Sequence, residues 1–102
     1  MMVFPPQGAT AHGGSIVLQW VSVGELQADE YYLVEVQDTT GNKSFFNVTR
    51  ETSMRVSGDI VPLDGQVHAM QWRVRVGKPT ANGAYGAIGA DTNWRTFQWQ
   101  NG

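Results

Sequence analysis

The stretch Met70-Gln71-Trp72-Arg73-Val74-Arg75-Val76 decides the fold of this chain. Apolar and polar residues alternate along it, and successive side chains of a β-strand point to opposite faces. One face therefore carries Trp72 and its aliphatic neighbours into a core, while the other face carries Arg73 and Arg75 to solvent. The stretch predicts a strand with one buried side.

Two further stretches repeat this pattern around a large aromatic residue. Ile16-Val17-Leu18-Gln19-Trp20 and Tyr32-Leu33-Val34-Glu35-Val36 both place apolar side chains at every second position. No segment shows a 3.6-residue period long enough for a helix of several turns. Short alternating runs with turn formers about every ten residues indicate a sandwich of two antiparallel sheets. We expect seven strands: Val3–Gly8, Ser15–Val21, Tyr31–Gln37, Ser44–Thr49, Ser53–Val56, Val67–Lys78 and Trp94–Gln100. The first carries Pro5 and Pro6, which cannot donate to a ladder, so it is an edge strand or only a lead-in.

The composition excludes several classes of function but does not identify one. The chain has 102 residues, which suits one domain, and seven basic against nine acidic residues give a net charge of −2. Without a basic field we expect neither nucleic-acid binding nor attachment to an anionic membrane. The apolar runs are only a few residues long, so we expect no insertion into a membrane. The absence of cysteine excludes disulfides, thiol nucleophiles and cysteine-based zinc sites.

The order of several motifs resembles a fibronectin type III domain, in the divergent form found in multidomain bacterial surface and signalling proteins. The resemblance runs from about Phe4 to Trp99. The motifs that carry it are Leu18-x-Trp20, Tyr32-x-Val34-x-Val36, Leu63, Trp72-x-Val74-x-Val76 and Trp94-Arg95-Thr96-Phe97-x-Trp99.

This resemblance implies a seven-stranded, antiparallel, immunoglobulin-like sandwich with sheets A-B-E and C′-C-F-G. Trp20 in strand B would lie at the centre of the core. It also implies that residues 1–102 form a single module of a longer protein, and it favours an extracellular or cell-surface location. One departure is that Met70 stands where the family usually has a tyrosine early in strand F, so the corner hydrogen bond of that tyrosine is not expected.

The residues that could carry chemistry do not form a recognisable motif. Serine, histidine and aspartate all occur, but nothing resembles a nucleophile elbow, and a catalytic triad is a geometry rather than a composition. The only histidines are His12 and His68, which are far apart in the sequence, whereas a zinc site needs three or four ligands. We therefore expect a non-enzymatic protein with no catalytic, cofactor or metal site.

The segment Pro79–Asn93 is the predicted contact surface. Its fifteen residues include three glycines and four alanines, and long loops without secondary structure tend to be functional or disordered. We expect it to be the most mobile segment. If Tyr85 and Ile88 are exposed they would anchor a partner, whereas if they pack on the sandwich they would only pin a connector. The predicted contact residues are Lys78, Asn82, Tyr85, Ile88 and Trp94.

Two functions are compatible with these patterns. The first is a structural or interaction module, monomeric in isolation, that acts as a spacer or binds another protein through residues 79–93. The second is a carbohydrate-binding accessory domain. Trp94 is the one tryptophan outside the predicted core, and with Tyr31 and Tyr85 it could stack on sugar rings. Three coplanar exposed rings on one surface would favour the second function.

The sequence also predicts one ion pair. Glu35 lies on the outward side of its strand, as do Arg73 and Arg75 on theirs. In the family that the chain resembles these two strands are antiparallel neighbours. We therefore expect Glu35 to face Arg73 or Arg75 across the sheet.

Overall fold

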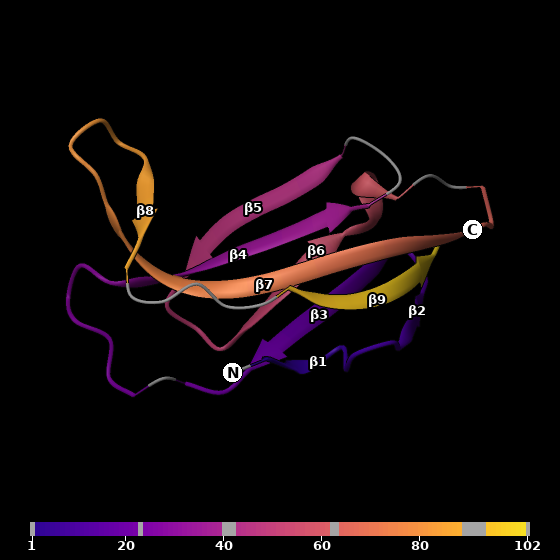
Figure 1. The fold of residues 1–102 in the computed structure, drawn as a ribbon, viewed down its shortest axis with the longest axis horizontal. Coiled ribbons are helices and arrows are strands. Elements are labelled where there is room, and N and C mark those ends of the chain that lie inside the picture. The colour runs from indigo at the N-terminus through magenta and orange to yellow at the C-terminus, as the bar shows by residue number, and fades with distance from the viewer. Residues whose placement is uncertain (1, 23, 40–42, 62–63, 89–93, 102) are drawn as a thin grey trace.

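A computed structural model describes residues 2–22, 24–39, 43–61, 64–88 and 94–101 of the chain (Figure 1). These residues form nine strands and one short 3₁₀ helix, η1, at Gly58–Ile60. The strands are β1 at Met2–Phe4, β2 at Thr10–His12, β3 at Ser15–Trp20, β4 at Tyr31–Asp38, β5 at Ser44–Thr49, β6 at Ser53–Ser57, β7 at Val67–Pro79, β8 at Tyr85–Ala87 and β9 at Arg95–Gln100.

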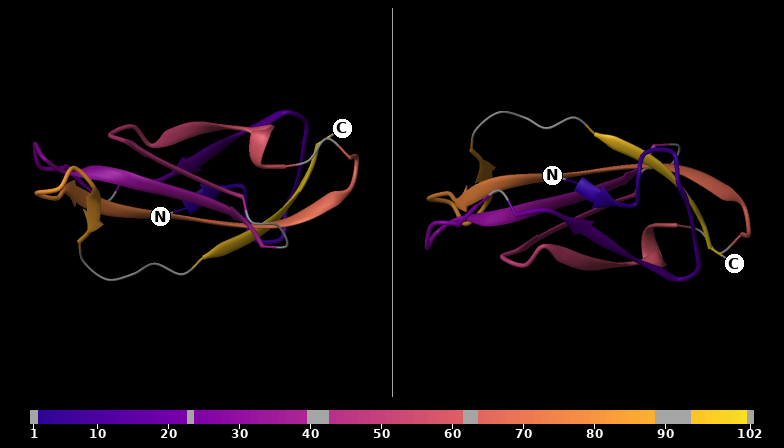
Figure 2. Two further views of the ribbon diagram at one scale, coloured as in Figure 1. Left: turned by 90° about the horizontal axis from the view of Figure 1, so that it is seen from above. Right: turned by 90° about the horizontal axis from the view of Figure 1, so that it is seen from below.

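The strands form two sheets in two layers, as the edge-on views show (Figure 2). The smaller sheet has the order β1-β3-β6, and the larger has the order β2-β9-β7-β4-β5, with β8 paired to β7. β3 and β4 are consecutive in the chain but lie in different sheets. The larger sheet is built around β4 and β7, which pair along eight residues. The expected all-β class with two sheets is confirmed.

The core lies between the sheets and is rich in aromatic side chains. Trp20 is 4% exposed, and Trp72 and Trp99 are fully buried. Trp20 and Tyr32 meet edge to face across the two sheets, with ring centroids 5.6 Å apart. The predicted inward positions of β3, β4 and β7 are confirmed, with Val76 half-buried at the margin. The core side chains are Ile16, Leu18, Trp20, Tyr32, Val34, Val36, Val56, Ile60, Val61, Met70, Trp72, Val74, Phe97 and Trp99.

The strand count differs from the expected seven because two three-residue strands were not foreseen. β2 falls between the expected strands Val3–Gly8 and Ser15–Val21, and it pairs with β9 in parallel, so the larger sheet is not purely antiparallel. β8 falls inside the segment Pro79–Asn93. β2 and β8 are too short to show an alternating apolar pattern, and each forms because a longer neighbour supplies its hydrogen-bond partners. Of the expected strand Val3–Gly8, only the first part is a strand, β1, which ends at Phe4.

One apolar side chain is buried on the outer face of the larger sheet. Leu33 alternates with the core residues of β4 and should point to solvent, yet it is only 1% exposed. A Cβ atom added to Gly77 would lie 2.5 Å from Leu33 Cδ1 and 2.7 Å from the carbonyl oxygen of Gly86. Because Gly77 lacks that atom, the Leu33 side chain and the β8 backbone can approach β7 closely.

Among the described residues, no helix has the length and apolar character needed to cross a membrane.

Candidate functional site

The predicted contact segment begins as a hairpin rather than as a loop. β7 continues to Pro79, and β8 returns antiparallel to it with Pro79 opposite Tyr85. The turn between them is closed by hydrogen bonds from Thr80 N to the Ala84 carbonyl (2.7 Å) and from Gly83 N to the Thr80 carbonyl (3.1 Å). The prediction of a structureless loop is therefore wrong for residues 79–87. Residues 89–93 lie outside the described residues.

The hairpin extends beyond the part of β7 that pairs with β9. β9 pairs with residues 67–72 of β7, and β8 pairs with residues 77–79. Gly77 pairs with Tyr31 on one side and with Ala87 on the other, so β8 and β9 share the side of β7 opposite β4. In Figure 1 the hairpin projects at one end of the molecule, and β9 ends toward the other.

The five predicted contact residues have different roles in the structure. Tyr85 is half-buried and meets Tyr31 edge to face, with ring centroids 5.7 Å apart, so it fastens the hairpin to the sheet. Asn82 shapes the turn, because its side-chain oxygen accepts a hydrogen bond from the Thr80 hydroxyl. Ile88 is 38% exposed and is the apolar side chain of the set that remains open to a partner.

The two ends of the set differ in environment. Lys78 Nζ lies 3.8 Å from Asp29 Oδ2, and both side chains are largely solvated, so this pair adds little stability. Trp94 is half-buried, and the Arg73 guanidinium stacks over its ring at 4.2 Å from the centroid. Trp94 thus contacts central strand β7 through Arg73, whereas Tyr85 and Asn82 make their contacts within or beside the hairpin.

An ion-pair network occupies the middle of the outer face. Glu35 is paired directly across the sheet with Arg73, as predicted. Arg73 Nε donates to Glu35 Oε1 at 3.1 Å, and Arg75 Nη2 donates to the same oxygen at 2.6 Å. The carboxylate therefore holds both arginines rather than one of the two. All three side chains are about one-fifth exposed, so solvent screens them only in part.

The aromatic rings on this face do not form one plane. The rings of Tyr31 and Tyr85 are inclined at 81°, and the Arg50 guanidinium lies 5.6 Å from the Tyr31 centroid. Arg73 covers one side of Trp94. The three coplanar rings that would favour carbohydrate binding are therefore not present in Tyr31, Tyr85 and Trp94.

A pocket of about 290 Å³ lies where β7 and β9 run together. The side chains that can hydrogen-bond there are the hydroxyls of Thr39 and Thr96 and the amide of Gln98. Its full lining is Gly8, Thr39, Ala69, Met70, Thr96, Phe97 and Gln98.

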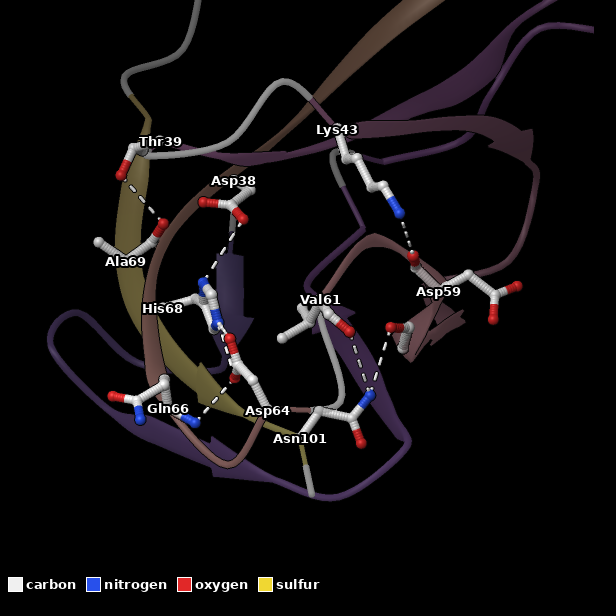
Figure 3. A network of polar contacts seen from close by, with 11 residues as sticks. Asp38, Thr39, Lys43, Asp59, Val61, Asp64, Gln66, His68, Ala69 and Asn101 are labelled. Atoms are coloured by element: carbon white, nitrogen blue, oxygen red, sulfur yellow. Dashed lines mark hydrogen bonds and ion pairs between the residues drawn. The ribbon is translucent and has the colours of Figure 1, made fainter.

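A second polar cluster joins the end of β4 to the start of β7 (Figure 3). His68 lies between two carboxylates: Nδ1 is 3.7 Å from Oδ2 of the buried Asp38, and Nε2 is 3.2 Å from Oδ2 of Asp64. A hydrogen bond from the Gln66 backbone N–H lowers the pKa of Asp64, and His68 lowers it further. Within the described ranges, no three side chains of the metal-binding types are arranged to hold an ion. His12 is exposed on β2 and takes no part in this cluster.

Comparisons of the chain with protein-family models, with curated proteins and with solved structures found no match.

Proposed function

We propose that this chain is a fibronectin type III-like sandwich that serves as a non-catalytic module of a larger bacterial protein, located at the cell surface or outside the cell. The observation that carries the proposal is the strand order. The order β1-β3-β6 supports an assignment as A-B-E, and the order β2-β9-β7-β4-β5 supports an assignment as G-F-C-C′ with β2 added beside β9. Trp20, at the strand B position, is buried between the sheets as the family requires.

The module would act as a spacer that also binds a protein at the hairpin end. The hairpin supports this role because its turn is ordered by its own hydrogen bonds and Tyr85 fixes it to the sheet. A rigid projection loses less conformational entropy on binding than a flexible loop does. Ile88 and Lys78 would supply an apolar and a cationic contact on this projection.

Photo-crosslinking in the full-length protein, in its own cells, tests the protein-binding role. A photoreactive amino acid at Ile88 should form a crosslink to one partner protein, while the same group at Val67 should not. Val67 is a matched control because it is 51% exposed and lies at the opposite end of β7. The purified partner should then bind Ile88→Asp at least about tenfold more weakly, with Val67→Asp unchanged. Equal crosslinking from both positions, or none from either, would contradict a binding role for the hairpin.

Carbohydrate binding is the second candidate, and the pocket beside β9 is the observation in its favour. Hydroxyl and amide groups such as those of Thr39, Thr96 and Gln98 are suited to neutral sugars. Trp94 lies outside the pocket lining, two residues before Thr96 in the chain. A glycan array followed by titration of Gln98→Ala would test it. If a sugar binds the wild type and the Gln98→Ala variant with equal affinity, its binding site is not this pocket.

A further inference from the structure

β5 is an edge strand that lacks the usual protection against pairing. One side of it pairs with Tyr32–Gln37 of β4, and no strand of the described chain pairs with its other side. Its sequence, Ser44-Phe45-Phe46-Asn47-Val48-Thr49, contains neither charge nor proline. Natural edges are commonly blocked by lysine, proline or a bulge. Phe46, in the middle of β5, is 52% exposed.

The hydrogen bonds around β5 show which residues face its open side. Asp38 N donates to the Lys43 carbonyl (3.1 Å), so the odd-numbered positions point toward β4. Backbone groups alternate along an antiparallel strand, which leaves those of Ser44, Phe46 and Val48 on the open side. Val48 N instead meets the side-chain oxygen of Asn47, at 2.8 Å. A local side chain thus stands in for a missing neighbouring strand.

We propose that β5 pairs with β5 of a second copy of this chain, antiparallel and about a two-fold axis through Asn47. Asn47 then faces Asn47 of the second copy, and Phe46 faces Val48. Phe46 and Val48 exchange backbone hydrogen bonds, and the two larger sheets become continuous. Phe46 and Val48 lie on the same outer face, so opposed residues meet on one side, as strand pairing requires.

Charge complementarity selects this register. Lys43 immediately precedes β5 and Glu51 lies in the bend that follows it, and both are exposed. With Asn47 on the axis, the antiparallel register brings the Lys43 end of each copy beside the Glu51 end of the other, which gives two opposite-charge contacts by symmetry. With Phe46 on the axis, Lys43 would face Thr49. With Val48 on the axis, Lys43 would face Ser53. In both alternatives, side chains on the outer face still meet side chains on the outer face, but both opposite-charge contacts are lost.

The association would be weak, because one short edge is smaller than the roughly 1,600 Å² of a stable protein interface. The monomer expected from sequence is then the state at low concentration, and the dimer forms as concentration rises. The proposal uses residues other than the hairpin contacts, so it does not depend on the proposed function.

Disulfide trapping tests the register directly, because the natural chain contains no cysteine. Asn47→Cys should give oxidised dimer roughly tenfold faster than Phe46→Cys, since a disulfide needs Cβ atoms about 3.5–4.5 Å apart and only position 47 lies on the axis. Arg55→Cys is the matched control on β6, the exposed edge of the other sheet. Faster trapping at Phe46→Cys would overturn the register, and equal rates at positions 47 and 55 would overturn the pairing.

Charge exchange tests the same contact without cysteine. Sedimentation equilibrium of the natural chain should show a concentration-dependent dimer. Lys43→Glu and Glu51→Lys should each weaken it roughly tenfold, and the double exchange should restore it to within about threefold of the natural chain. A chain that remains monomeric to its solubility limit, or a double exchange no better than the single variants, would overturn the proposal.

Discussion

Substitution of Gly77 by alanine tests how the β7–β8 hairpin packs. The added Cβ would lie 2.5 Å from Leu33 Cδ1 and 2.7 Å from the Gly86 carbonyl oxygen, closer than real contacts allow. Overpacking of this kind costs about 1–3 kcal/mol. For a domain of this size each kcal/mol lowers the Tm by about 4–8 °C, so Gly77→Ala should melt about 4–24 °C below the wild type.

Gly86→Ala is the matched control, measured by the same thermal and urea denaturation. Its Cβ would meet only Thr80 Cγ2, at 3.3 Å, so its free energy of unfolding should stay within about 0.5 kcal/mol of the wild type. Leu33→Ala in the Gly77→Ala background should relieve one of the two clashes. The two substitutions should therefore couple by about 0.5–3 kcal/mol. A Gly77→Ala protein as stable as Gly86→Ala would refute the packing of Leu33 and β8 against Gly77.

Three further experiments test the core, the ion-pair network and the polar cluster around His68. Trp20→Ala should cost about 3–5 kcal/mol in urea unfolding because Trp20 is 4% exposed, and a loss under 1 kcal/mol would place it outside the core. A double-mutant cycle of Glu35→Ala with Arg73→Ala should give a coupling of roughly 0.2–1 kcal/mol, and zero coupling would reject an energetic role for the pair. The pKa of Asp64 is lowered from 3.8 in the folded protein, so its stabilising effect is complete above about pH 5 and is lost as pH falls through the folded pKa. The stability difference between wild type and Asp64→Asn should therefore shrink in acid, and a difference independent of pH would contradict this.

The strands whose inward side chains the sequence predicts correctly are those long enough to show alternation. β3, β4, β7 and β9 each bury every second side chain, because one face of each lies against the opposite sheet. β2 and β8 have three residues each, and they exist through their pairing with β9 and β7. That pairing depends on contacts between distant parts of the chain, which local periodicity does not report.

The candidate site was predictable to the same extent. The Glu35–Arg73 pair could be predicted because both side chains alternate with core residues and therefore point outward. Their two strands are neighbours in the family that the chain resembles. The stacking of Arg73 on Trp94 requires the register of β9 against β7 as well. The contact of Tyr85 with Tyr31 requires the hairpin, which the glycine-rich and alanine-rich composition of the segment concealed. The burial of Leu33 does not follow from alternation, because alternation does not report the space left by Gly77.

Neighbouring-strand contacts measured by NMR in solution test the central claim, which is the division of the strands between two sheets. We expect nuclear Overhauser effects between backbone protons of Leu33 and Val48 and of Glu35 and Arg73, which join β5, β4 and β7 in one sheet. We expect further effects between Val17 and Arg55, which join β3 to β6 in the other sheet. Backbone contacts that pair β3 directly with β4, as a simple meander would, contradict the sandwich and the functions proposed from it.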